Sequence, residues 1–176
     1  GCLVMANCVS VIPQMHGGNQ EKNLRAGTEN LAGIVAFGEA VVLAVKDIEA
    51  FQRLAVLRDK IESRLSALAP IKIFGSGVDR VVNTSMFALP GVASETQMIA
   101  LDLAGICVSN GSACSSGTVK ASHVLKAMGI SNDEAESSLR ISLGWDTTAK
   151  DVDAFIDAWL QMYERVKKKV KDTAHA

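Results

Sequence analysis

Residues 109–144 read SNGSACSSGTVKASHVLKAMGISNDEAESSLRISLG, and three local patterns in this stretch decide the fold of the chain. Small polar side chains fill 109–117, which predicts an exposed loop. Residues 118–129 have helical spacing and end at Gly129, a residue suited to a helix C-cap. Apolar and polar side chains then alternate in LRISL at 139–143, so we expect a half-buried strand there.

The same mixture of helical and strand-like patterns extends along the rest of the chain. Thr147 or Thr148 with Asp151 resembles a capping box and predicts the start of the last helix. The other expected elements are a strand at 3–12, a loop at 16–30, helices at 31–50, 52–68 and 94–103, and strands at 71–74, 81–89 and 106–109. This order predicts an α/β (α+β-like) fold with a small, mostly antiparallel sheet packed with helices.

Composition excludes several classes of function. The chain has 176 residues, of which 48% are hydrophobic and 21% charged, so a packed core is expected and disorder is not. The formal net charge of −1 gives no general field for nucleic acid or anionic lipid. No stretch approaches the roughly 20 apolar residues that cross a bilayer. The cysteine spacings match no metal site, and free thiols in a reducing cytoplasm are the simplest interpretation.

Cys114 is the residue whose surroundings point most directly to chemistry. It lies between Ala113 and Ser115 in the loop of small residues, where nothing could bury it. An exposed thiol is a liability unless it is used, so a reactive role is favoured over chance exposure. Cys107, in contrast, lies in the apolar segment GICVSN, which predicts a buried and inert thiol.

Arg140 and Thr28 are weaker candidates on their residue types alone. Arg140 is the only charged residue in LRISL. It is either a surface arginine or a residue whose planar guanidinium binds a carboxylate through two parallel hydrogen bonds. Thr28 lies in a glycine-containing loop, which could bind a phosphate or could be turn structure with Thr28 or Asn30 as a helix cap. For Arg140, sequence alone favours the surface arginine, and for Thr28 it leaves the two alternatives equal.

Two segments together resemble group I cysteine desulfurases. HGGNQEKNLRAGTEN at 16–30 is similar to their HGGGQE…LRSGTEN segment, and the stretch at 109–144 is similar to their SSGSAC(S/T)SG…SHVL.AMG…A..S.R.SLG segment. The intervening lengths and the order of elements also agree, so the resemblance covers essentially the whole chain. The Ser-Ala-Cys-Ser core is typical of group I.

The resemblance implies a pyridoxal-phosphate enzyme of aminotransferase class V with fold type I, of which this chain would be the C-terminal part. Such transferases convert L-cysteine to L-alanine, leave a persulfide on the enzyme and pass its sulfur to an iron–sulfur scaffold or another acceptor protein. By motif position, Cys114 would be the nucleophile and Arg140 would hold the substrate carboxylate. Thr28 would contact the cofactor phosphate across the interface of a homodimer.

The chain also departs from the family. The Schiff-base lysine of the family, its histidine stacked on the cofactor ring and its aspartate at the pyridine nitrogen have no counterpart here. Trp145 replaces the usual arginine, Asn19 a glycine and Asn110 a serine. We therefore expect the isolated chain to be inactive, and the alternative function is a non-catalytic sulfur-relay or interaction domain.

The resemblance further predicts two domains. Residues 1–30 would be the tail of the large cofactor-binding domain, and 31–176 would be the small C-terminal domain with the cysteine loop.

Overall fold

The structure is a computed structural model that describes residues 1–110 and 122–174, with side chains described as far as residue 169. It divides the chain into two compact units, 1–49 and 50–176. The division falls within the short helix α3, Ile48–Phe51. In the part of the chain that the structure describes, no helix is both long and apolar enough to span a membrane.

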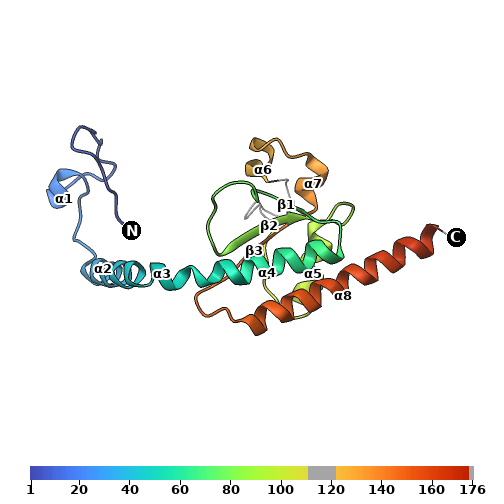
Figure 1. Cartoon of the computed structure of the whole chain (residues 1–176). Helices are drawn as coiled ribbons and strands as arrows, with labels where there is room; N and C mark the ends of the chain where they lie inside the picture. Colours follow the sequence, from blue (N-terminus) through green and yellow to red (C-terminus); the bar gives the residue numbers. More distant parts are fainter. Residues whose placement is uncertain (111–121, 175–176) are drawn as a thin grey trace. The chain divides into compact units, whose positions relative to one another are not determined.

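The second unit is built on a small antiparallel sheet. Its strands are β1 (Lys72–Ile73), β2 (Thr84–Ala88) and β3 (Ser138–Ser142), in the order β1-β2-β3 (Figure 1). The register places Arg140 of β3 opposite Met86 of β2. The predicted α/β fold with a small antiparallel sheet is confirmed. Its strand at 106–109, however, is reduced to one bridge between Ser109 and Arg140.

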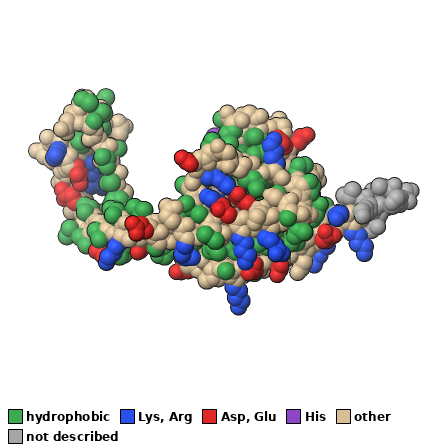
Figure 2. All heavy atoms as spheres, viewed as in Figure 1, with side chains coloured by type: hydrophobic (Ala, Val, Ile, Leu, Met, Phe, Trp, Pro, Cys, Tyr) green, Lys and Arg blue, Asp and Glu red, His purple; other side chains and the backbone are tan. Residues whose placement is uncertain are grey.

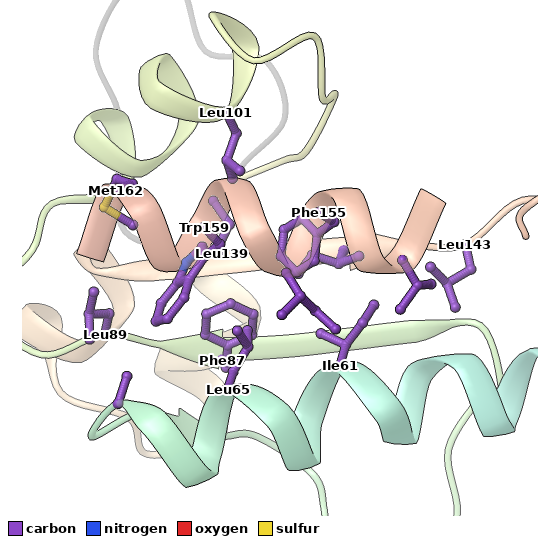
Figure 3. Packing of buried hydrophobic residues seen from close by; sticks show 14 of the residues in the cluster. Ile61, Leu65, Phe87, Leu89, Leu101, Leu139, Leu143, Phe155, Trp159 and Met162 are labelled. Carbon is purple, nitrogen blue, oxygen red and sulfur yellow. The ribbon is translucent and has the colours of Figure 1, made fainter. Parts of the chain in front are cut away.

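Three helices cover one face of the sheet: α4 (Arg53–Leu68), α5 (Ser94–Asp102) and α8 (Ala149–Ala174). Figure 3 shows Trp159 of α8 and Phe87 of β2 pointing toward one another between α4 and α8. Their ring centroids lie 5.7 Å apart, with the rings at 81°. Both side chains are fully buried, so this edge-to-face pair lies at the centre of the core.

The predicted amphipathic patterns form this core. The apolar stripe of α8 is buried at spacings of three and four residues. The alternation in β3 buries Leu139 and Ile141 and leaves Ser142 exposed. The capping box is also present: the Asp151 carboxylate accepts from the Thr148 backbone N–H at 2.8 Å, and the Thr148 hydroxyl accepts from the Asp151 N–H at 3.3 Å.

Two short helices, α6 (His123–Ala127) and α7 (Asn132–Glu136), pack with the opposite face of β2. Gly129 has φ +76° and ends α6 as predicted: its N–H donates to Lys126 O, and the N–H of Ile130 donates to Leu125 O. Sequence analysis missed α7. Its signal was the capping box of Ser131, whose hydroxyl accepts from the Glu134 N–H at 3.3 Å.

A nearly buried ion pair joins α4 to the segment before β2. Arg80 donates to both carboxylate oxygens of Glu62 at 2.7 and 2.6 Å, and the Ser85 hydroxyl donates to the same carboxylate at 2.6 Å. Burial raises the pKa of Glu62, but these hydrogen bonds and the charges of Arg80 and Arg58 outweigh it and hold the pKa below its ordinary value. Glu62 in turn raises the pKa of Arg80.

The first unit has almost no core. It contains the short turn α1 (Gln20–Asn23) and the helix α2 (Leu31–Lys46), and Ala26 is its one buried residue, all of 1–49 being described. The predicted strand at 3–12 is wrong for this structure. A strand is stable only when a neighbouring strand pairs with its backbone, and residues 3–12 have no such neighbour here.

Candidate functional site

Arg140 occupies the middle of β3, between two other segments. On one side it pairs with β2, and on the other its backbone N–H donates to Ser109 O at 2.6 Å while its own carbonyl accepts from the Ser109 N–H at 3.1 Å. Its guanidinium donates to the Ser109 hydroxyl at 3.4 Å. The side chain is half-buried on the face of β3 opposite Leu139 and Ile141. The sheet therefore fixes the backbone position of Arg140.

In the part of the chain that the structure describes, Arg140 has no acidic partner. Among the described residues, no carboxylate lies within ion-pair distance of its guanidinium, whereas Arg80 and Arg58 each pair with one. Residues 111–121 contain neither Asp nor Glu. A half-buried guanidinium normally has an anionic partner, because burial removes much of its hydration. Arg140 is thus suited to bind the carboxylate of a ligand through its planar fork.

Ser109, which pairs with Arg140, lies two positions before the segment that carries Cys114. Cys114 itself lies in residues 111–121, outside the described residues. Ser109 precedes this segment and is held by the bridge to Arg140. Ser122 follows it, is almost fully buried and caps α6 by accepting from the Leu125 N–H at 3.5 Å. The described residues Ser109 and Ser122, on either side of the cysteine segment, are therefore held in the sheet and in a helix cap.

The prediction that Cys107 is buried is wrong. Its side chain is exposed, while its neighbours Ile106 and Val108 are half-buried against the core. Extended backbone alternates its side chains, so inward Ile106 and Val108 turn Cys107 outward. Cys2 and Cys8 are exposed as well. Access to solvent therefore does not by itself single out one thiol of this chain.

Thr28 lies in the first unit, in the predicted loop at 16–30. Its side chain is exposed, and its hydroxyl makes no hydrogen bond among the described residues. The neighbouring turn is shaped by Gly27 at φ +97° and by Arg25, which donates to the carbonyls of Gly27 and Thr28 at 3.1 Å. The cap of α2 is Asn30, which accepts from the Gly33 N–H at 3.0 Å. The question of which residue caps α2 is thus settled, and the Thr28 hydroxyl is left free for a ligand.

The site residues that sequence reasoning missed are supporting ones. Ser109 contacts Arg140 through both backbone and side chain, and its pairing across 31 residues has no local signal. Sequence did not find the groove of about 420 Å³ between α5 and α8, which is lined in part by Ile99, Leu103 and Arg165. This groove does not include Arg140 or Ser109. In the described ranges, no cluster of His, Cys, Asp or Glu has the arrangement of a metal site.

The sequence of residues 4–155 matches the aminotransferase class-V family. The chain belongs to this family. Its similarity to cysteine desulfurases is also confirmed: the cysteine desulfurase IscS of Dictyoglomus turgidum is 37% identical over 172 residues, which cover 95% of this chain and 43% of the relative. A cysteine desulfurase of Cereibacter sphaeroides is 39% identical over 158 residues, which cover 89% of this chain and 40% of the relative.

The chain is also similar to solved structures of NifS-like proteins. A NifS-like protein from Rickettsia africae superposes with a TM-score of 0.78 at 34% identity, over 89% of this chain and 41% of that protein. Another NifS-like protein superposes equally well at 30% identity. The chain spans about two fifths of the length of these proteins. The chain therefore has the fold of a part of these NifS-like proteins.

Proposed function

We propose that this class V chain is the C-terminal part of a pyridoxal-phosphate-dependent cysteine desulfurase. The observation that carries the proposal is Arg140, a half-buried guanidinium that has no acidic partner among the described residues. It is fixed by Ser109, two positions before the segment that contains Cys114. L-Cysteine supplies the carboxylate that Arg140 lacks and the sulfur that a nucleophilic thiol would take. The similarity to proteins named cysteine desulfurase supports the same choice.

Arg140 would bind the substrate carboxylate and orient the amino acid. Cys114 is the fifth residue after Ser109, and an extended chain of that length spans at most about 18 Å. The thiolate of Cys114 would form a new S–S bond with the substrate sulfur as the substrate's Cβ–S bond breaks. The electron pair of the broken bond stays with Cβ, which takes up a proton to give L-alanine, and the extra sulfur remains on Cys114 as a persulfide.

The residues described here fit one end of the cofactor. The free Thr28 hydroxyl beside Gly27 is suited to the phosphate group. When bound, pyridoxal phosphate delocalises the electron pair that develops on the substrate carbon. The family's lysine anchor has no counterpart in this chain, so the proposed activity belongs to the complete enzyme, which we infer to be a homodimer.

The persulfide sulfur would pass to an iron–sulfur scaffold or another acceptor protein. Three exposed free thiols among the described residues are compatible with a reducing compartment, and we place the protein in the cytoplasm on that ground. The residue boundary between the cofactor domain (1–30) and the small domain (31–176) is part of this proposal. It differs from the division of this structure at residue 49, because α2 belongs with the first unit here.

A chimeric enzyme tests the function directly. The part of the Dictyoglomus turgidum relative that precedes its match is fused to this chain, and alanine formation from L-cysteine is measured together with the mass of each cysteine-containing peptide. We expect alanine at stoichiometries above one per enzyme and an added sulfur on Cys114. Arg140→Ala should suppress both. A chimera that binds the cofactor but forms no alanine would favour the relay alternative, and sulfur found on Cys107 would refute the assignment of the nucleophile.

A further inference from the structure

Arg140 is flanked on its face of the sheet by two residues of different character. Met86 of β2 pairs with it on one side, and Ser109 bridges to it on the other. Residues directly opposite each other in antiparallel strands place their side chains on the same face. Met86 is half-buried and packs against the apolar cluster that α6 and α7 share with the sheet. The Arg140 side chain therefore has an apolar neighbour on one side and a hydroxyl on the other.

The Ser109 hydroxyl is held in place by the backbone around it. Ser109 and Arg140 exchange two backbone hydrogen bonds, of 2.6 and 3.1 Å, as a hydrogen-bonded pair does in an antiparallel ladder. The Arg140 guanidinium donates to Ser109 Oγ at 3.4 Å. An arginine side chain has several rotatable bonds, so a contact that restricts them before a ligand arrives lowers the entropy cost of binding.

The hydroxyl restrains the guanidinium without neutralising it. Figure 2 shows acidic side chains interspersed with Lys and Arg on the visible face of the second unit, and pairs such as Lys72 with Glu134, at 2.6 Å, are formed there. A carboxylate at position 109 would form such a pair with Arg140 and compete with a carboxylate ligand. A hydroxyl accepts a hydrogen bond and adds no charge, so the positive charge that attracts a ligand carboxylate is kept.

We propose that Ser109 is a positioning residue, whose hydroxyl orients the Arg140 guanidinium for the carboxylate of the substrate. This inference rests on the proposed function, in which Arg140 binds the carboxylate of L-cysteine. Ser109 acts through Arg140 and not by contact with the reacting atoms. Removing the hydroxyl therefore weakens carboxylate binding although the charge of Arg140 is unchanged.

Sodium acetate is the probe, because it carries the carboxylate alone and its binding needs neither cofactor nor catalysis. It is titrated into the 176-residue chain with isotopically labelled arginine nitrogens, against sodium chloride at equal ionic strength. The Arg140 Nε–Hε resonance, identified by its loss in Arg140→Lys, reports binding by NMR. We expect saturable acetate binding that weakens about two- to tenfold in Ser109→Ala, the range for one lost hydrogen bond, and is restored in Ser109→Thr.

Ser142→Ala is the matched control, because Ser142 is exposed on the same face of β3, two residues beyond Arg140. It should bind acetate as the wild type does. Unchanged or tighter binding in Ser109→Ala would overturn the proposal, because the hydroxyl would then be dispensable or would compete for the guanidinium. An equal loss in both alanine variants would overturn it as well. If Ser109→Ala does not fold, Ser109→Thr and Ser109→Val, which match in shape, give the same comparison, and equal affinities would refute the role of the hydroxyl.

The chimeric enzyme separates this inference from the proposed function. There, Ser109→Ala should raise the KM for L-cysteine by the same factor and leave kcat unchanged, because the contact acts equally on bound substrate and transition state. An active chimera whose KM does not respond would overturn the role of Ser109 alone. An inactive chimera would count against the proposed function, while the acetate series still decides whether Ser109 positions Arg140. Absence of saturable acetate binding in the wild-type chain would overturn the inference.

Discussion

Removing the guanidinium from the Glu62–Arg80 pair should destabilise the second unit more than removing an exposed charge. The side chains of Glu62 and Arg80 are only 11% and 20% exposed, and two hydrogen bonds of 2.6–2.7 Å join them. Arg80→Met leaves the carboxylate with the Ser85 hydroxyl as its remaining donor. The perturbation therefore creates a largely buried charge that lacks its counter-ion.

The magnitude follows from this burial. Breaking a buried ion pair by removing one partner costs about 3–5 kcal/mol. Arg80 is one-fifth exposed, so water replaces part of its solvation, and we expect about 3 kcal/mol, the lower end of that range. The matched control is Lys60→Met, on the same helix α4 as Glu62. Lys60 pairs with Asp153 at 2.6 Å, but both side chains are more than one-third exposed, so its loss should cost about 0–1 kcal/mol.

The assay is urea unfolding followed by tryptophan fluorescence, with the buried Trp159 as the reporter. The folded pKa of Glu62 is lowered below its ordinary value of 4.5. The stability that the Glu62 carboxylate contributes to the folded state is therefore fully present above pH 4.5. It is lost as the pH falls through the lowered pKa that Glu62 has in the folded state. In Arg80→Met the carboxylate has lost its main partner, and protonation relieves the unpaired charge. The difference in free energy of unfolding between wild type and Arg80→Met should accordingly become smaller in acid.

Two results would refute this reasoning. One is an Arg80→Met cost at pH 7 no larger than that of Lys60→Met, which would mean that the pair contributes no more than a surface contact. The other is a cost that stays constant through the acid range, which would show that the lost packing of the arginine stem, rather than the charge, accounts for the effect.

The remaining predictions concern the site and one helix end. In the chimeric enzyme, Arg140→Lys keeps the charge but loses the bidentate fork, so the Michaelis constant for L-cysteine should rise by roughly 10- to 150-fold, corresponding to 1.5–3 kcal/mol; an unchanged value in steady-state kinetics would contradict the assignment. Cys114→Ser should abolish persulfide formation detected by mass spectrometry, while Cys107→Ser should retain it; the reverse pattern would move the nucleophile. Gly129→Ala places a side chain at φ +76° and should cost about 1 kcal/mol in urea unfolding, whereas Gly77→Ala, in open space without a positive φ, should be nearly neutral; equal costs would show that the left-handed cap is unimportant.

Much of the candidate site could be predicted from the sequence, but not its partners. Arg140 and Thr28 were found through motifs, and the alternation of LRISL placed Arg140 on the correct side of its strand. The pairing of Arg140 with Ser109, the absence of an acid near its guanidinium and the use of Asn30 as the cap of α2 are spatial facts. Cys107 shows the limit most clearly: an apolar sequence context predicted burial, yet alternation turned this one side chain outward.

The sequence by itself determined the features that have a strong local pattern. Amphipathic spacing predicted α4 and α8, glycine conformation predicted the end of α6, and alternation predicted which side chains of β3 are buried, because each pattern is written in residues close together in the chain. Only the tertiary structure decided which apolar segments become ordered core. Residues 3–12 have strand-forming composition but no strand, and α2 is a helix with no buried side, because pairing and burial require neighbours that local sequence does not supply.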